Sequence, residues 1–330
     1  MKKIKVAQIG TSRNSHGTPI WKTLLALPEL FDVVGYAFPE GEKERFPEWA
    51  KYFDGHREMT VEEILSDPEI EAVTVETEEI HLVKYAQMVA DAGKHLHMEK
   101  PGSPDLASFE RLVDTLEEKG LVFSLGYMYR FNPVIADAIR RVREGELGEI
   151  FSVEAHMNCT HSVGTRQWLE AFPGGMLYFL GCHLIDLIYR IQGEPKAVLP
   201  LSCSSEMEGV TAEDFGMAVL QYPHGVSFAK STAVESGGFL RRQLVINGER
   251  GTIEIRPLEV IDGKLQYTRS GEIFGTEWHT PPECKKSESF DRYAAMMTNF
   301  AELVRGKENP YTYEYERGLF RLLLRACGKE

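Results

Sequence analysis

His97-Met98-Glu99-Lys100-Pro101 closes a short apolar stretch and places a lysine directly after it. Residues 95–98 are predicted to form a buried strand, and the chain before them repeats a pattern of short apolar strand and longer helix. Strands that alternate with helices form a parallel sheet covered on both faces, and such sheets bind ligands at the carboxyl ends of their strands. Lys100 is therefore expected at the ligand-binding edge of a parallel sheet.

The other strands of this sheet are predicted at residues 5–9, 33–38, 72–75 and 122–125. Thr60 and Glu63 have the spacing of a capping box, so a short helix should begin there. A helix is also predicted over 81–92, and another should have Ser103 as its N-cap and end at Lys119. Together these elements predict a Rossmann-type dinucleotide-binding domain over residues 1–123.

After Gly148 the pattern changes to successive strands joined by short turns, which indicates an antiparallel sheet. The predicted strands are 150–158, 197–204, 215–222, 226–234, 240–246, 252–255 and 264–268. Asn132 should cap a helix that runs to residue 144, and one helix, 175–191, should interrupt the strands. Two helices, 289–305 and 314–326, should end the chain.

The predicted fold class is therefore α/β, with a parallel sheet followed by an α/β domain that contains a large, mainly antiparallel sheet. This second domain spans residues 124–330, and its sheet is able to cover a substrate pocket with one face and to pair with a second subunit through the other. The last helix is expected to be able to pack back on the first domain.

Composition limits the classes of function. The net charge of −13 argues against nucleic acid as a partner, because neutralising phosphates requires a basic face. No apolar run approaches the ~20 residues that cross a bilayer, so no membrane partner is expected. The five cysteines are scattered and never spaced as a Cys-x-x-Cys pair, which indicates reduced thiols. The chain begins without a signal-peptide core, and a cytoplasmic protein is predicted.

The turn after the first strand is where a dinucleotide's pyrophosphate would be held by backbone N–H groups. The usual Gly-x-Gly-x-x-Gly fingerprint begins with Gly10 but has Ser12 and Ser15 at its second and third glycine positions. Gly10, Ser12, Arg13 and Asn14 are still candidates for cofactor binding, since the loop offers amides and hydroxyls and Arg13 is able to pair with a phosphate. The alternative is that this loop is a plain connector.

The end of the second strand normally carries an acid that binds the ribose hydroxyls. Phe38 has that place here, and Glu40, two residues later, either substitutes for it or is a surface glutamate. Glu40 and Glu42 would repel a 2′-phosphate, so NAD is predicted rather than NADP. Lys43 and Arg45 weaken that preference.

His183 and Asp186 are three residues apart on a predicted helix and so share one face. A carboxylate beside an imidazole orients it and raises its pKa, which suits a general base near neutral pH. The alternative is a structural pair that ties the helix to its surroundings. His156, Cys159 and His161 resemble metal ligands, but strand alternation separates His156 from the other two, and no metal is predicted.

Four motifs in order carry a resemblance to a known family. They are Ala92-Gly93-Lys94-His95-Leu96-His97-Met98-Glu99-Lys100-Pro101, Tyr129-Arg130-Phe131-Asn132-Pro133, Trp168 followed by Gly174-Gly175 and Leu180-Gly181-Cys182-His183-Leu184-Ile185-Asp186, and Gly248-Glu249-Arg250-Gly251-Thr252-Ile253-Glu254. They resemble the glucose–fructose oxidoreductase / inositol 2-dehydrogenase (Gfo/Idh/MocA) family, and the resemblance covers essentially the whole chain.

The resemblance implies an NAD(P)-dependent oxidoreductase that transfers a hydride between a sugar or polyol hydroxyl carbon and nicotinamide. It implies that Lys100 polarises the reacting oxygen and that His183 is the general base. It also implies a homodimer or homotetramer formed through the C-terminal sheet. Further residues implied in substrate binding are Arg130, Asn132, Trp168 and Asp186, and Thr77 and Glu99 are assigned to the cofactor.

The chain departs from the family pattern at several cofactor and substrate positions. The family's Ala-Thr-Pro-Asn at the third strand reads Glu76-Thr77-Glu78-Glu79, and its aspartate four residues before the histidine is Phe179. Three carboxylates there are expected to repel phosphates. Two alternatives therefore stay open: a catalytically inactive family member that acts as a sensor or interaction protein, and a sugar-modifying enzyme that uses transient oxidation with bound NAD.

Overall fold

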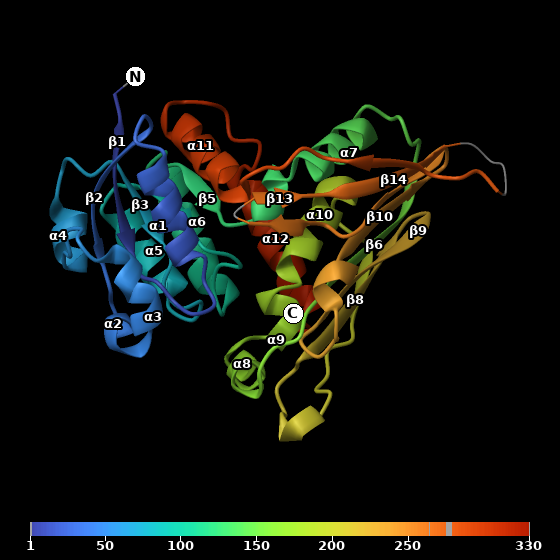
Figure 1. The fold of residues 1–330 in the computed structure, drawn as a ribbon, viewed down its shortest axis with the longest axis horizontal. Helices are drawn as coiled ribbons and strands as arrows, with labels where there is room; N and C mark the ends of the chain where they lie inside the picture. Colours follow the sequence, from blue (N-terminus) through green and yellow to red (C-terminus); the bar gives the residue numbers. More distant parts are fainter. Residues whose placement is uncertain (1, 264, 275–278, 330) are drawn as a thin grey trace. The chain divides into compact units, whose positions relative to one another are not determined.

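The computed structural model describes residues 2–263, 265–274 and 279–329. The chain forms two compact units (Figure 1). The first contains Met1–Tyr127 and Tyr293–Arg317, and the second contains Met128–Arg292 and Gly318–Glu330. The predicted domain limits, 1–123 and 124–330, stay a prediction.

The first unit is built on a five-stranded parallel sheet in the order β2-β1-β3-β4-β5. Its strands are β1 (Ile4–Ile9), β2 (Phe31–Ala37), β3 (Ala72–Val75), β4 (His95–Met98) and β5 (Phe123–Leu125). Every residue of β3 is buried, as expected for a parallel sheet covered on both faces. The predicted Rossmann-type sheet is confirmed.

The helices of this unit connect the strands, and two short ones were not predicted. They are α1 (Gly17–Ala26), α2 (Glu42–Arg45), α3 (Pro47–Ala50), α4 (Val61–Ser66), α5 (Leu82–Asp91), α6 (Leu106–Glu118) and α11 (Arg292–Val304). Thr60 and Glu63 form the predicted capping box of α4. The N-cap of α6 is Asp105 and not Ser103, because the Asp105 carboxylate accepts the Ser108 N–H at 2.8 Å.

The second unit contains an eight-stranded sheet in the order β15-β14-β11-β10-β6-β9-β8-β7. All neighbouring strands are antiparallel except β6 and β9. The strands are β6 (Ile150–Asn158), β7 (Ala197–Pro200), β8 (Phe215–Tyr222), β9 (Gly225–Thr232), β10 (Gln243–Gly248), β11 (Gly251–Ile255), β14 (Arg269–Phe274) and β15 (Glu283–Lys286). The predicted large, mainly antiparallel sheet is confirmed.

The strand predicted at 264–268 begins outside the described residues, and β13 (Leu265–Tyr267) covers its described part. This strand pairs with β12 (Val260–Asp262) in a separate two-stranded sheet. Besides α7 (Pro133–Arg143), the unit contains a short α8 (Val163–Trp168). The last helix, α12 (Tyr313–Ala326), is divided between the two units at Arg317.

The single helix predicted over 175–191 is two helices, α9 (Gly175–Phe179) and α10 (Cys182–Gln192). The N–H of Gly181 donates to the carbonyl of Met176, five residues back, so the regular helical ladder is interrupted there. A Cβ at Gly181 would lie 2.7 Å from the carbonyl oxygen of Leu177, which explains the glycine. No helix in the described part of the chain is long and apolar enough to cross a membrane.

Candidate functional site

Gly10 lies at the carboxyl end of β1 and begins the loop that leads to α1. Its φ of +90° is a conformation that favours glycine. A Cβ there would lie 2.6 Å from the backbone nitrogen of Thr77, at the end of β3. The first glycine of the fingerprint is therefore required by the close approach of two strand ends.

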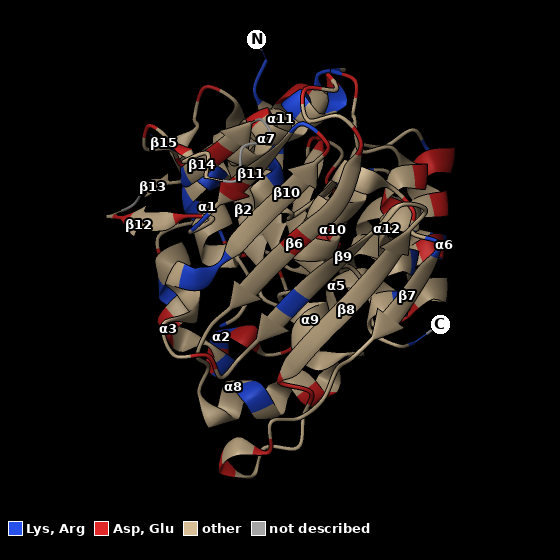
Figure 2. Ribbon diagram, turned by 90° about the vertical axis from the view of Figure 1, so that its right-hand side faces the viewer, with Lys and Arg blue, Asp and Glu red and all other residues tan. Residues whose placement is uncertain are grey.

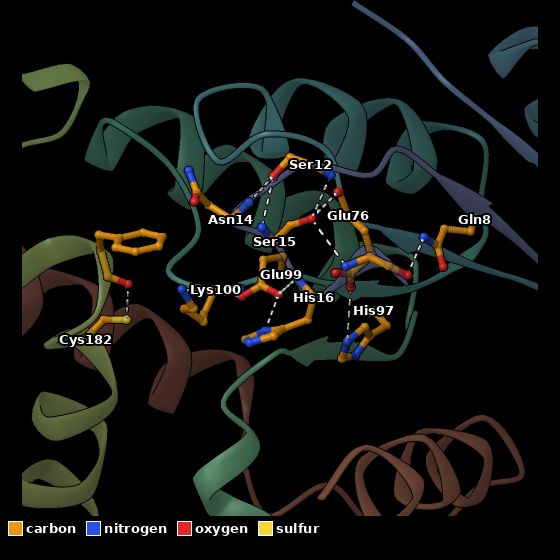
Figure 3. A network of polar contacts seen from close by, with 12 residues as sticks. Gln8, Ser12, Asn14, Ser15, His16, Glu76, His97, Glu99, Lys100 and Cys182 are labelled. Carbon is orange, nitrogen blue, oxygen red and sulfur yellow. Dashed lines mark hydrogen bonds and ion pairs between the residues drawn. The ribbon is translucent and has the colours of Figure 1, made fainter. Parts of the chain in front are cut away.

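The two serines that replace the fingerprint glycines bind the loop to itself (Figure 3). The Ser12 hydroxyl accepts the N–H groups of Asn14 and Ser15 at 3.2 and 2.9 Å. The Ser15 hydroxyl accepts the N–H groups of Ser12 and Gly17 and donates to the carbonyl of Glu76. Because these amides already have acceptors, the serines close the loop that glycines would leave open.

Two glutamates accept the remaining amides at the ends of the loop. The Glu99 carboxylate accepts the His16 N–H at 3.1 Å and lies 2.7 Å from the Nδ1 of the same histidine. The Glu42 carboxyl accepts the N–H groups of Thr11 and Glu78 at 3.1 and 3.3 Å. The amide cradle that would hold a pyrophosphate is therefore largely filled by side chains of the chain itself.

Arg13 is the exception in this loop. Within the described residues, neither its N–H nor its exposed guanidinium has a hydrogen-bond or ion-pair partner, and the buried Thr11 hydroxyl also has none. An amide, a cation and a hydroxyl are suitable donors for a phosphate. The residues present thus fit a dinucleotide whose pyrophosphate is bound at Arg13. They do not fit a dinucleotide whose pyrophosphate is bound by all the backbone N–H groups of the loop, because most of these groups already have acceptors.

Glu40, a candidate for the ribose, is bound by neighbours in α5. It has a φ of +56°, and its carboxylate accepts from Lys84 Nζ at 2.6 Å and from the Tyr85 hydroxyl at 2.7 Å. These two hydrogen bonds lower the pKa of Glu40 to about 2. Glu42, which the sequence connected only with the choice between NAD and NADP, is fully buried beside the loop. Its position after a turn gave no sign that its side chain would be buried.

Further carboxyl groups gather at the carboxyl edge of the sheet. Glu76, Glu79 and Glu99 are at most 3% exposed, and Lys100 is 2% exposed, with its Nζ 3.6 Å from Glu99 Oε1. Burial alone would raise the pKa of Glu99, but His16 and Lys100 outweigh it and lower that pKa to about 2. Glu99 is therefore ionised at neutral pH.

The other two acids behave in the opposite way. Burial raises the pKa of Glu79 to about 8, against the opposing effect of Lys100. Burial, together with the nearby Glu99, raises the pKa of Glu76 well above its usual value. Neither acid accepts a hydrogen bond in the described part of the chain, which is consistent with a protonated carboxyl.

This corrects the expectation that the three carboxylates after β3 would repel phosphates. Burial raises the pKa values of both Glu76 and Glu79, which disfavours their charged forms, and Glu78 pairs with Arg45 at 2.7 Å. Burial raises the pKa of Glu42 to about 8 as well, against the two backbone N–H bonds it accepts. Charge repulsion at this edge is therefore much smaller than a count of acids suggests.

In the second unit, Arg130 and Asp186 form a buried ion pair. The Asp186 carboxylate accepts from Arg130 Nε at 3.1 Å and from Nη2 at 2.8 Å, and both side chains are almost fully buried. The His183 ring is 1% exposed and contacts Tyr129 edge-on, with ring centroids 5.2 Å apart. Arg130 is thus an identified partner of Asp186. The predicted pairing of Asp186 with His183 stays a prediction.

Asn132 and Trp168 have defined places in the same unit. Asn132 caps α7 through its side-chain oxygen, and its Nδ2 donates to the Leu258 carbonyl and the Thr268 hydroxyl. Trp168, at the end of α8, contacts Phe172 and Phe179 at ring-centroid distances of 4.6 and 5.1 Å. The assignment of these two residues to substrate binding stays a prediction.

Comparison with known proteins gives the family. The model described as "Oxidoreductase family, NAD-binding Rossmann fold" matches residues 4–127, and the model "GFO/IDH/MocA C-terminal domain" matches residues 135–254. An uncharacterised oxidoreductase of Rhizobium meliloti, ORF334, is 30% identical over 307 residues, which are 89% of this chain and 88% of that protein. The chain belongs to the Gfo/Idh/MocA family. It is an oxidoreductase of this family with an NAD(P)-binding Rossmann fold.

Two named relatives are similar to this family member. The scyllo-inositol 2-dehydrogenase (NADP(+)) IolW of Bacillus subtilis (strain 168) is 29% identical over 217 residues, which are 64% of this chain and 58% of that enzyme. A levoglucosan dehydrogenase, solved in complex with NADH and levoglucosan, has a TM-score of 0.79 and 18% identity, with 99% of this chain and 98% of that chain covered. At that identity the second comparison supports the fold alone.

The raised pKa of Glu79 predicts how the stability of this Gfo/Idh/MocA chain depends on pH. A folded pKa near 8 means that the contribution of Glu79 to stability is fully present below about pH 4.5 and is lost as the pH rises through 8. Glu79→Gln lacks the ionisable group, so we expect it to be more stable than the wild type by roughly 2–4 kcal/mol at pH 8.5 and about equally stable at pH 5. Urea unfolding at both pH values measures the difference.

The matched control for this prediction is Glu62→Gln on the exposed part of α4, which should leave the pH dependence unchanged. A stability difference between Glu79→Gln and the wild type that is the same at both pH values would contradict the raised pKa.

The Arg130–Asp186 pair predicts a large loss of stability when one member is removed. Asp186→Asn removes the charge of a buried carboxylate that pairs with the buried Arg130 guanidinium, so we expect the unfolding free energy to fall by about 3–5 kcal/mol. Asp137→Asn, in the exposed pair with Arg140, is the control and should cost less than about 1 kcal/mol. Equal losses in the two variants would show that burial of the pair is not what matters.

Proposed function

We propose that this chain is a nicotinamide-dependent oxidoreductase that acts on a hydroxyl-bearing carbon of a sugar or polyol. The observation that carries the proposal is a buried lysine, Lys100, placed at the carboxyl end of β4 beside the Gly10 loop, within a motif of the family. When bound, the nicotinamide would accept or return the hydride. The names of the two relatives, which act on scyllo-inositol and levoglucosan, support this class of substrate.

The role proposed for Lys100 is to stabilise the negative charge that develops on the reacting oxygen. Its ammonium group is almost fully shielded from water, where an electrostatic interaction is stronger than in solvent. Glu99 Oε1 lies 3.6 Å from Nζ, so the lysine has a carboxylate beside it. A buried lysine ammonium beside a carboxylate is a suitable hydrogen-bond donor for polarisation of a hydroxyl or carbonyl oxygen.

The role proposed for His183 is that of the general base that takes the hydroxyl proton. The Tyr129 ring lies nearly perpendicular to this imidazole, and the Tyr129 hydroxyl is itself bonded to Glu259 at 2.9 Å and to Arg242 at 3.3 Å. These contacts restrict the orientation of the ring, as a positioned base requires. Arg130, Asn132, Trp168 and Asp186 are proposed to bind or support the substrate.

NAD is the proposed cofactor, with NADP the less suitable one. Two basic residues, Lys43 and Arg45, could pair with a 2′-phosphate, but each already pairs with a carboxylate. Lys43 Nζ lies 2.5 Å from Glu58, and Arg45 lies 2.7 Å from Glu78. Gly10, Ser12, Arg13, Asn14, Glu40, Thr77 and Glu99 are the residues proposed to surround the cofactor. One relative is named with NADP(+) and another with NADH, so the names do not decide between the cofactors. The proposed preference for NAD therefore rests on the ion pairs of Lys43 and Arg45.

The second candidate function is a catalytically inactive family member that acts as a sensor or interaction protein. The observation that favours it is the closed Gly10 loop, in which Arg13 retains the one amide without an acceptor between residues 11 and 17 in the described chain. A protein of this kind would bind no nicotinamide nucleotide, which separates the two functions experimentally.

We also propose that the chain assembles as a homodimer or homotetramer through the C-terminal sheet and that it is cytoplasmic. Strands β6, β8, β9 and β10 carry few charged residues (Figure 2). Phe151 and Val226 on this sheet are 43% and 49% exposed, and a second copy would bury such side chains. The five thiols are free, two of them exposed, which suits a reducing compartment.

The proposed function predicts binding of NADH. Titration should enhance NADH fluorescence with a dissociation constant tighter than that for NADPH. Arg13→Gln should weaken NADH binding by about tenfold, because a charge-assisted contact to phosphate is lost, whereas the surface variant Lys307→Met should bind as the wild type does. If neither nucleotide binds the wild type at millimolar concentration, the oxidoreductase proposal fails and the inactive alternative stands.

The role of Lys100 predicts a loss of turnover. With a polyol or sugar that supports NAD+ reduction in a substrate screen, Lys100→Met should lower kcat by at least about a hundredfold, the effect expected when one donor to a developing oxyanion is removed. Initial rates from NADH absorbance measure it, again with Lys307→Met as the control. An unchanged kcat in a folded Lys100→Met protein would remove the lysine from the mechanism.

A further inference from the structure

The second unit buries four arginine side chains among its described residues, and three of them pair with carboxylates. Arg130 pairs with Asp186, Arg141 with Glu146 and Glu272, and Arg166 with Glu208 and Asp214. The fourth is Arg242, which is 9% exposed and forms no ion pair with a residue that the structure describes. Arginine is rarely buried without an acidic partner, so this guanidinium requires an explanation.

The contacts of Arg242 leave part of its hydrogen-bonding capacity unused. Its Nε donates to the backbone carbonyl of Asn158 and its Nη1 to the Tyr129 hydroxyl, both at 3.3 Å, which is beyond the usual upper limit of about 3.2 Å. The group also lies beside the Cys159 thiol, because Arg242 opposes the effect of burial, which raises the pKa of that thiol to about 11. A guanidinium carries more N–H donors than these contacts use, and a thiol is a weak acceptor. The remaining donors have no oxygen acceptor in the described part of the chain.

The charges around Tyr129 do not balance within the described residues. The Tyr129 hydroxyl donates to Glu259 at 2.9 Å, and Glu259 forms an ion pair with Arg292. Arg242 therefore adds a second cation to a group that contains one carboxylate. Phe239 packs on the guanidinium, with its ring centroid 4.6 Å from Cζ, and brings no compensating charge. A cation that is shielded from water is costly unless an anion lies beside it.

Tyr129 also places this cation next to the proposed general base. The ring centroids of Tyr129 and His183 are 5.2 Å apart, so one tyrosine separates the imidazole from the guanidinium. Arg242 also adds to the lowering of the pKa of His161 that burial causes. The His161 ring lies 6.4 Å from that of Phe179, which replaces the aspartate of the family pattern. At that position the chain therefore lacks a carboxylate that would compete for the guanidinium or repel an acidic substrate.

We propose that Arg242 is a substrate-binding residue that recognises a carboxylate, so that the substrate of this chain is a sugar acid, such as an aldonate or a uronate. The inference rests on the proposed function and names its substrate class. Two parallel N–H groups of a guanidinium match the two oxygens of a carboxylate, and such charged hydrogen bonds are strong. A carboxylate carries one negative charge, which balances the excess cation around Tyr129. A phosphate monoester carries about 1.5 to 2 negative charges and would require a further cation.

The proposal predicts a preference for acids over neutral sugars of the same carbon skeleton. Three matched pairs of compounds differ by one carboxylate: D-gluconate and D-glucitol, D-glucuronate and D-glucose, and D-galacturonate and D-galactose. Isothermal titration calorimetry on the full chain, with and without NADH, measures the dissociation constant of each compound. We expect the acid of at least one pair to bind at least about tenfold more tightly than its neutral partner, because it gains hydrogen bonds between charged groups.

Variants at two neighbouring arginines assign this preference to one side chain. Arg242→Met should remove the preference, so that the acid and the neutral compound bind within about twofold of each other. Arg242→Lys keeps the charge but not the paired N–H groups and should retain only part of the preference. The matched control is Arg241→Met, because Arg241 is exposed and pairs with Glu235 at 3.1 Å. Its loss should leave the preference within about twofold of that of the wild type.

Urea unfolding of the ligand-free protein separates a binding role from a structural one. Removal of an arginine that has no acidic partner should not lower the unfolding midpoint of Arg242→Met. A lower midpoint together with an intact acid preference would mean that Arg242 only supports Tyr129 and Asn158, and this result overturns the proposal. If Arg242→Met does not fold, Arg242→Lys decides, and its acid preference must fall by at least about threefold.

The outcomes distinguish this inference from the function on which it rests. Loss of the acid preference in Arg242→Met, but not in Arg241→Met, supports the proposal. A wild type without acid preference in any pair overturns it, and so does tighter binding of D-glucose 6-phosphate than of D-glucuronate. In both cases, NADH binding by the wild type leaves the oxidoreductase proposal intact. If the wild type binds no NADH, the proposed function fails, and the titrations without NADH still decide whether Arg242 binds a carboxylate.

Discussion

The hydrogen bonds of the Glu99 carboxylate to His16 are the interaction on which the candidate cofactor site depends. They join the end of β4 to the loop before α1, and Oε1 of the same carboxylate lies 3.6 Å from Lys100 Nζ. Burial raises the pKa values of Glu76 and Glu79 beside it, whereas at Glu99 the effects of His16 and Lys100 outweigh burial and lower the pKa. One carboxylate thereby lies beside the lysine, binds the loop before α1 and adds to the rise in the pKa values of Glu76 and Glu79 that burial causes.

The loop after β1 illustrates how two different requirements compete for the same backbone groups. Buried N–H groups need acceptors whether or not a ligand is present. Ser12 and Ser15 provide these acceptors within the loop, and glycines at their positions would have left the amides to a phosphate. The serines therefore stabilise the loop without ligand at the expense of affinity for one, which is why Arg13 becomes the residue with unused binding capacity.

Sequence patterns predicted the features that depend on neighbours close in the chain. The strands of the parallel sheet, the capping box at Thr60 and the Asn132 cap follow from local spacing and apolar runs. The bonds of Glu42 to Thr11 and of Glu99 to His16 join residues 31 and 83 positions apart, and no local pattern encodes them. Local patterns also do not encode the raised pKa values of Glu76 and Glu79 after β3, because these follow from burial. A count of charges therefore led to the wrong expectation that these acids repel phosphates. The break at Gly181 was missed because a glycine inside an apolar helix pattern is tolerated in most contexts.

The departures from the family pattern around β2 are connected by one packing constraint. Phe38 contacts Tyr36 and Phe53 at ring-centroid distances of 4.7 and 4.9 Å, so the place of the ribose acid is used to extend an aromatic cluster of the first unit. An acid at this position would remove an apolar ring from that cluster. Glu42, four residues later, brings a carboxyl group back to the loop, but it binds the amides of Thr11 and Glu78 from the protein side. Ser12, Ser15 and Glu42 thus act in one direction: each accepts within the chain an amide of the loop that a dinucleotide's phosphate would otherwise accept, so ligand binding here must compete with the fold's own contacts.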